Sequence, residues 1–129
     1  MTVHHIGYLV KNIEKAVDQF KKLGYDAYSG KSFDEFRKIA IVFLKKNSMV
    51  IELVSPISNE SVIYGLLKHY KNSPYHICYE SESFEEDLEN LKQSGFTAIA
   101  EPAAAPAIEN RKVVFLMSPV IGLIELLEA

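Results

Sequence analysis

The chain has 129 residues, of which 48% are hydrophobic and 24% charged, a composition typical of a globular domain and not of a disordered chain. Its formal net charge of −3 is mild, and no basic stripe or acidic tail predicts a nucleic acid or a charge-driven partner. The single cysteine, Cys78, excludes an internal disulfide and fits a reducing compartment.

The apolar stretches are strand-sized, far short of the roughly 20 residues that cross a bilayer. The N-terminus also lacks the charged segment and the apolar segment of a signal peptide. We therefore expect a soluble, cytoplasmic protein that does not associate with membranes.

The first half of the chain predicts a strand, a helix and then about three strands. The first strand carries His5, and Asn12 then offers a helix N-cap before apolar residues that recur at helical spacing. Gly24 is a typical helix stop. The half closes on an apolar strand at 49–54 that has Glu52 in its interior. Residues 58–72 then predict a connecting helix, which Pro74 ends.

The second half repeats this order. A strand with His76 precedes a helix that starts at Ser83, where Glu86 three residues later completes a capping box, and Gly95 stops the helix. Residues 101–107 hold two prolines among alanines and predict a loop. The half closes on an apolar strand at 122–127, which has Glu125 in its interior.

These similarities indicate an internal repeat. The two histidines are 71 positions apart (76 − 5) and the two glutamates 73 (125 − 52), so the offset is kept across a whole half of the chain. The expected modules are roughly 2–55 and 74–128. Joined by the linker helix, they form one domain over residues 1–129, of mixed α+β class.

Four polar residues stand out because they interrupt apolar strands. Side chains alternate faces along a strand, so His5, Glu52, His76 and Glu125 are expected on the face away from the helices. Two buried carboxylates need a compensating charge, and two imidazoles with two carboxylates suit a divalent first-row transition metal. We therefore predict these four residues as ligands of one metal ion.

Two other histidines are weighed and set aside. His4 competes with His5 for the ligand position, but the repeat aligns His5-Ile6 with His76-Ile77 and so favours His5. His69 falls in the linker helix beside polar residues and is expected at the surface.

In these motifs the chain resembles the vicinal oxygen chelate superfamily, which includes glyoxalase I, methylmalonyl-CoA epimerase, extradiol dioxygenases and antibiotic-resistance proteins. The resemblance rests on His5-Ile6-Gly7 before a helix, the closing Glu52 strand, His76-Ile77, and the final Glu125 strand. It implies two βαβββ modules whose sheets curve into a half-barrel around a metal site. It also implies a homodimer.

Within the superfamily, the ligand order resembles that of bacterial-type glyoxalase I (lactoylglutathione lyase). This implies isomerisation of the hemithioacetal of methylglyoxal and a small thiol to an S-2-hydroxyacyl thioester, through a metal-stabilised enediolate, in methylglyoxal detoxification. Glu125 would be the main proton-transferring base and Glu52 a ligand or second base. At this chain length the resemblance favours nickel or cobalt, with zinc as a further possibility.

The alternatives remain open at this stage. Methylmalonyl-CoA epimerase usually has glutamine in place of Glu52, but the turn that follows Glu52 here looks more like the epimerase. A non-catalytic small-molecule or antibiotic-binding protein of the same fold is a lesser alternative. Arg37 and Arg111 occupy equivalent repeat positions and would bind an anionic substrate group, or else be solvated cations. The sequence leaves open the thiol or acyl substrate, the cellular metal, and whether a site forms within one chain.

Overall fold

A computed structural model describes all residues, 1–129, and divides them into two compact units. The N-terminal unit is Ile6–Tyr75, and the C-terminal unit combines Met1–His5 with His76–Ala129. The division cuts through two strands, so the first residues of the chain belong with its second half. No helix has the length and apolar character needed to cross a membrane.

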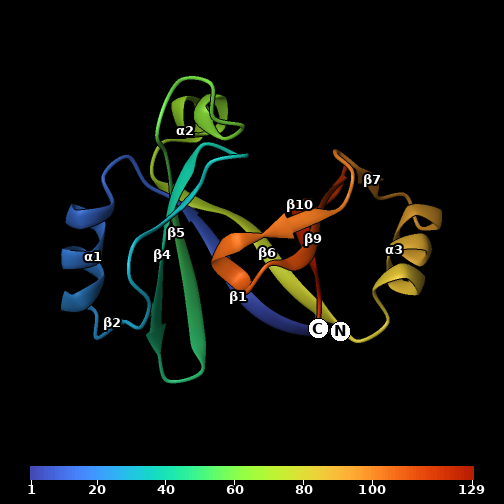
Figure 1. The fold of residues 1–129 in the computed structure, drawn as a ribbon, viewed down its shortest axis with the longest axis horizontal. Helices are drawn as coiled ribbons and strands as arrows, with labels where there is room; N and C mark the ends of the chain where they lie inside the picture. The colour runs from blue at the N-terminus through green and yellow to red at the C-terminus, as the bar shows by residue number, and fades with distance from the viewer. The chain divides into compact units, whose positions relative to one another are not determined.

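The N-terminal unit contains one strand–helix–strand repeat followed by a short helix (Figure 1). Strand β1 pairs in parallel with β5, β5 pairs antiparallel with β4, and the short strands β2 and β3 both pair with β4. The elements in chain order are β1 (Thr2–Leu9), α1 (Ile13–Lys22), β2 (Asp26–Ala27), β3 (Ser32–Asp34), β4 (Ile39–Lys46), β5 (Met49–Pro56) and α2 (Tyr64–Tyr70).

The C-terminal unit repeats the same plan. Strand β6 pairs in parallel with β10, β10 pairs antiparallel with β9, and β7 and β8 both pair with β9. The elements are β6 (Ser73–Ser81), α3 (Phe84–Gln93), β7 (Thr97–Ala98), β8 (Ala103–Ala105), a 3₁₀ turn (Pro106–Ile108), β9 (Arg111–Ser118) and β10 (Gly122–Glu128). The predicted α+β class and its two βαβββ modules are confirmed; in each module one edge strand is broken into two short pieces.

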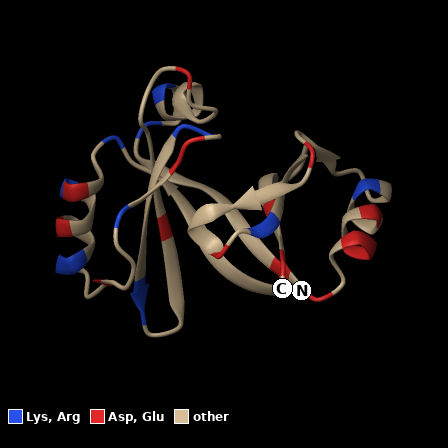
Figure 2. Cartoon of the chain, in the orientation of Figure 1, with Lys and Arg blue, Asp and Glu red and all other residues tan.

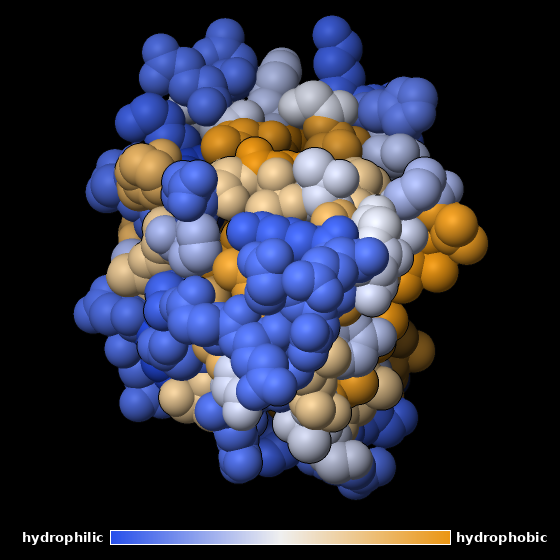
Figure 3. All heavy atoms as spheres, turned by 90° about the vertical axis from the view of Figure 1, so that its right-hand side faces the viewer, coloured by the Kyte–Doolittle hydropathy of each residue, from blue (hydrophilic) through white to orange (hydrophobic).

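Each helix covers one face of its unit's sheet and forms a core with it. In the N-terminal unit, residues of β5 such as Ile51 and Leu53 pack with residues of α1 such as Ile13. In the C-terminal unit, Ile124 and Leu126 of β10 pack with α3 in the same way. The charged residues of both helices lie off these cores, and acidic and basic positions gather on α1 and α3 (Figure 2). In the space-filling view, hydrophilic side chains form a broad central patch, with apolar side chains exposed around it (Figure 3).

The predicted helix signals hold with two exceptions. The connecting helix predicted at residues 58–72 is shorter, Tyr64–Tyr70, and ends before Pro74, which lies in strand β6. Asn12 caps α1 by accepting a hydrogen bond from the backbone of Lys15, and Gly24 and Gly95 follow the two helices with φ of +93° and +99°. The expected capping box at Ser83 is wrong, because its side chain makes no capping hydrogen bond. Instead the hydroxyl of Ser81 accepts a hydrogen bond from the backbone N–H of Ser83 and contacts the carboxylate of Asp87.

The loop predicted at residues 101–107 is also wrong in part. Ala103–Ala105 form strand β8, which pairs with Arg111–Val113 of β9, and a 3₁₀ turn starts at Pro106. The two prolines flank the strand and do not interrupt it, so neither removes a backbone donor from the three paired residues.

Candidate metal centre

Three of the four predicted ligands meet inside the C-terminal unit. His5, His76 and Glu125 are only 1%, 4% and 4% exposed. The Nε2 atoms of the two histidines lie 3.2 Å apart, and Oε1 of Glu125 is 3.2 Å from Nε2 of His5 and 3.5 Å from Nε2 of His76. One carboxylate oxygen and two imidazole nitrogens thus form a nearly equilateral triangle.

Strand alternation explains this convergence. Ile124 and Leu126 belong to the core with α3, so Glu125 between them points to the opposite face of the sheet. On the neighbouring strand β9 its Cα partner is Phe115, whose ring meets His76 edge-on with centroids 5.0 Å apart. This aromatic contact restricts the rotation of the imidazole and keeps water from that side.

The electrostatics of Glu125 depend on the two imidazoles. Burial by itself raises the pKa of this carboxyl, but the adjacent His5 and His76 outweigh burial and hold the pKa well below its ordinary value. The carboxylate is therefore ionised at neutral pH. Its Oε1 is nonetheless buried without a hydrogen-bond partner of ordinary geometry, although both imidazole nitrogens are close.

The donor set fits a divalent cation. Ligand bonds of about 2.0–2.2 Å place neighbouring donor atoms about 3.0–3.5 Å apart around an octahedral or tetrahedral ion. The three separations in the triangle fall in this range. A cation would also satisfy the orphaned oxygen of Glu125.

The fourth predicted ligand, Glu52, belongs to the N-terminal unit. It is 5% exposed and points away from α1, because its neighbours Ile51 and Leu53 form the core with that helix. Its Cα partner on β1 is Gly7, and its charge, added to burial, raises the pKa of Tyr28. Its part in the metal centre stays a prediction.

The two arginines predicted to bind substrate each form an ion pair. Arg37 donates to the buried carboxylate of Asp34 over 2.7 Å. Arg111 donates to the carboxylate of Glu80 and to the backbone carbonyl of Glu128. Both guanidiniums thus have protein partners, and anion binding by either remains a prediction.

Sequence reasoning passed over two residues beside the centre. His4, set aside in favour of His5, places its Nδ1 2.8 Å from Nδ1 of His5. Cys78 is fully buried and is the Cα partner of Glu125, and its sulfur lies within 4.8 Å of both histidines. For His4, the available signal in the sequence was its position next to His5. For Cys78, it was the two-residue spacing from His76, which places both side chains on the same face of the strand. His69 is exposed on α2, as expected.

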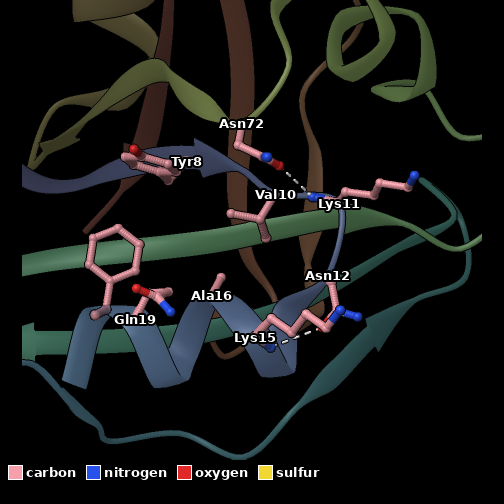
Figure 4. A pocket seen from close by; sticks show the side chains of 9 residues that line it. Tyr8, Val10, Lys11, Asn12, Lys15, Ala16, Gln19 and Asn72 are labelled. Atoms are coloured by element: carbon pink, nitrogen blue, oxygen red, sulfur yellow. Dashed lines mark hydrogen bonds between the residues drawn. The ribbon is translucent and has the colours of Figure 1, made fainter. Parts of the chain in front are cut away.

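A separate cleft of about 550 Å³ lies in the N-terminal unit between the end of β1 and helix α1 (Figure 4). Tyr8, Val10 and Phe20 give it an apolar lining, and the side-chain oxygen Oδ1 of Asn72 accepts a hydrogen bond from the backbone N–H of Lys11 at its edge. None of the predicted site residues lines this cleft. It is therefore distinct from the candidate metal centre.

A repeated βαβββ unit with buried imidazoles and a carboxylate defines a class of protein, and the family comparison agrees. Residues 4–115 match the Glyoxalase/Bleomycin resistance protein/Dioxygenase superfamily, and the chain belongs to this superfamily.

Its relatives are more specific. Bovine mitochondrial methylmalonyl-CoA epimerase is 28% identical over 116 residues, which cover 88% of this chain and 65% of the bovine protein. The ethylmalonyl-CoA/methylmalonyl-CoA epimerase of Cereibacter sphaeroides is 27% identical over 117 residues, covering 88% of this chain and 86% of that protein. The chain therefore spans less than two thirds of the bovine relative's length, but most of the bacterial one.

A solved structure agrees with this fold. A variant of Streptomyces coelicolor methylmalonyl-CoA epimerase, in complex with 2-nitronate-propionyl-CoA, superposes with a TM-score of 0.87 over 100% of this chain and 94% of that chain. The sequence identity is 16%, so this likeness establishes the shared fold alone.

The sequence-based prediction of a glyoxalase I is wrong. The relatives are methylmalonyl-CoA epimerases, so neither lactoylglutathione lyase activity nor methylglyoxal detoxification is supported. The prediction rested on a glutamate in place of glutamine at position 52. Both side chains offer a cation an oxygen donor, so this difference does not separate the two enzymes. The turn after Glu52, which resembled the epimerase, was the better signal.

Proposed function

We propose that this protein is an enzyme of the isomerase type that epimerises methylmalonyl-CoA or a similar 2-alkylmalonyl-CoA. The observation that carries the proposal is the buried triangle of His5, His76 and Glu125, in a chain related to methylmalonyl-CoA epimerases over 88% of its length. The proposal covers the acyl-CoA substrate as well as the reaction.

In this proposal, His5, His76, Glu125 and Glu52 would hold a divalent cation. The two imidazoles would be neutral donors, so only carboxylate groups would offset the charge of the ion. The cation would supply Lewis-acid stabilisation of the negative charge that develops on the thioester oxygen when the neighbouring carbon loses its proton. Nickel or cobalt remains the prediction for its identity, with zinc also compatible with these ligands.

The protein's own groups then move the proton. Inversion at carbon requires that a proton leave one face and return to the other. Glu125 is ionised at neutral pH and accepts the proton on its face. Glu52, the equivalent residue of the other repeat, is assigned to the opposite face, where it gives a proton to the carbon while Glu125 keeps the proton that it accepted. The ring of Phe115 against His76 helps to exclude water from this region.

Deuterium exchange tests the proposal directly. The purified protein, with nickel, cobalt or zinc supplied separately, is incubated with one epimer of methylmalonyl-CoA in deuterium oxide. We expect one deuterium at the carbon between the two carbonyl groups, together with loss of optical purity. Isobutyryl-CoA, which is branched but has no second carboxyl group, is the control and should exchange far more slowly. Absence of exchange into methylmalonyl-CoA with all three ions would refute the proposal.

The assembly and location of the enzyme also stay as predicted from the sequence. A homodimer in the cytoplasm is expected. Sedimentation of the purified chain would check the dimer.

A further inference from the structure

The contact between His4 and His5 has a consequence for the candidate metal centre. Their Nδ1 atoms lie 2.8 Å apart and their rings meet edge-on at 78°, with centroids 5.1 Å apart. Two imidazole nitrogens at this distance form a hydrogen bond in which one carries the proton and the other offers its lone pair.

The other nitrogen of His5 decides which residue donates. Nε2 of His5 points to His76 and Glu125, at 3.2 Å from each. A ring nitrogen that binds a cation carries no proton, so in neutral His5 the proton must be on Nδ1. The Nδ1–H of His5 then donates to Nδ1 of His4.

We propose that His4 is a positioning residue, which accepts the Nδ1 proton of His5 and thereby holds the Nε2 lone pair of His5 on the metal. The inference rests on the proposed function only in that both require a cation at His5, His76 and Glu125. It assigns to His4 the outer-shell role that orients a metal-binding imidazole and strengthens it as a donor.

The surroundings of His4 favour this role. Fully buried Cys78 lies within 4.8 Å of both histidines, which limits the space for water beside the hydrogen bond.

Two substitutions distinguish the effect of the hydrogen-bond acceptor of His4 from the effect of its ring volume. His4→Phe keeps an aromatic ring but removes the acceptor. His4→Asn places an amide oxygen close to the position of Nδ1 and so restores it. We expect His4→Phe to bind zinc about 10–100-fold more weakly than the wild type, and His4→Asn to stay within about threefold. A chelator competition measures all three dissociation constants, and circular dichroism confirms that the variants fold.

The tautomer of His5 provides a readout that does not depend on affinity. In the zinc-loaded wild type, nitrogen chemical shifts from long-range ¹H–¹⁵N spectra should show His5 protonated at Nδ1, and the same tautomer should persist in His4→Asn. If His4→Phe binds zinc as tightly as the wild type, the role of His4 is refuted while the metal centre stands. If His5 is protonated at Nε2 in the zinc-loaded protein, that nitrogen does not bind the ion, and the role of His4 fails together with the assignment of His5 as a ligand. If the wild type binds no divalent ion, the proposed function fails together with this inference.

Discussion

The two units share one architecture but divide the polar chemistry unequally. Each has a parallel strand pair, a covering helix and a buried glutamate in its closing strand. The C-terminal unit nevertheless holds three of the predicted ligands and the N-terminal unit only Glu52. The cause is strand β1, whose first residues, including His5, belong to the C-terminal unit. The two histidines thus lie at the points where the chain passes between the units, His5 before the first and His76 after the second.

The arginines at equivalent repeat positions show a second difference. Arg37, in the connection between β3 and β4, pairs with Asp34 at the end of β3, only three residues away, and Asp34 is 3% exposed. Arg111 instead pairs with Glu80 on another strand, and both of its pair's side chains are partly exposed. Both units therefore have an arginine at the equivalent position, but the acidic partners differ. The contribution of the ion pair to the free energy of unfolding should therefore differ between the units.

The largest expected effect comes from the two glutamates. Glu125→Gln should lower both deuterium exchange and inversion of methylmalonyl-CoA by roughly 10²–10⁴-fold, because an amide cannot accept the proton. Glu52→Gln should abolish inversion but leave exchange on the Glu125 face, since its amide oxygen still serves as a ligand. Chiral analysis of the product with mass spectrometry measures both quantities.

Each glutamate variant also has a clear contrary result. Full activity of Glu125→Gln would show that it is not the base. Full inversion by Glu52→Gln would show that Glu52 is a ligand without a part in proton transfer. Metal content of both variants, measured by mass spectrometry, controls for loss of the ion.

The next effect compares the two cores. Leu53 and Leu126 follow the two glutamates, and both are fully buried in their own clusters. Leu53→Ala and Leu126→Ala should each lower the free energy of unfolding by about 2–5 kcal/mol, by loss of buried area and creation of a cavity. Urea denaturation measures both. A loss below about 1 kcal/mol in only one of them would mean that the units are not equally well packed.

Much of the fold followed from local patterns in the sequence. Strand alternation placed Glu125 opposite Ile124 and Leu126, and the Asn12 cap and the glycine after each helix marked where the helices begin and end. These features depend on neighbours within a few residues, so the sequence carries their signal directly.

Other features were not specified by any local pattern. The inclusion of the first five residues in the C-terminal unit depends on partners distant in the chain. The pairing of Ala103–Ala105 with β9 was hidden by the two flanking prolines. The contact of His4 with His5 was missed because simple alternation sends adjacent side chains of a strand to opposite faces. The choice of substrate was missed for a different reason, since ligand types alone do not distinguish acyl-CoA from hemithioacetal.

Metal removal tests whether the centre stabilises one unit more than the other. A cation at a hundred times its dissociation constant stabilises the folded state by about 2.7 kcal/mol. Removing it with a chelator should therefore lower the melting temperature by several degrees. Hydrogen exchange should increase most in β10 and in the His76–Ser81 part of β6. Equal loss of protection in β4 and the C-terminal strands would contradict this assignment.

The smallest effect concerns the two ion pairs. Arg37→Met leaves the buried carboxylate of Asp34 with the backbone N–H of residue 37 but without its charged partner, and should cost about 1–3 kcal/mol of unfolding free energy. Arg111→Met breaks a partly exposed pair and should cost about 1 kcal/mol or less. Urea denaturation at low and high salt measures both, with Asp34→Asn combined with Arg37→Met as the control that removes the buried charge. If Arg111→Met proved the more destabilising, the long-range pair between strands would be the stronger of the two.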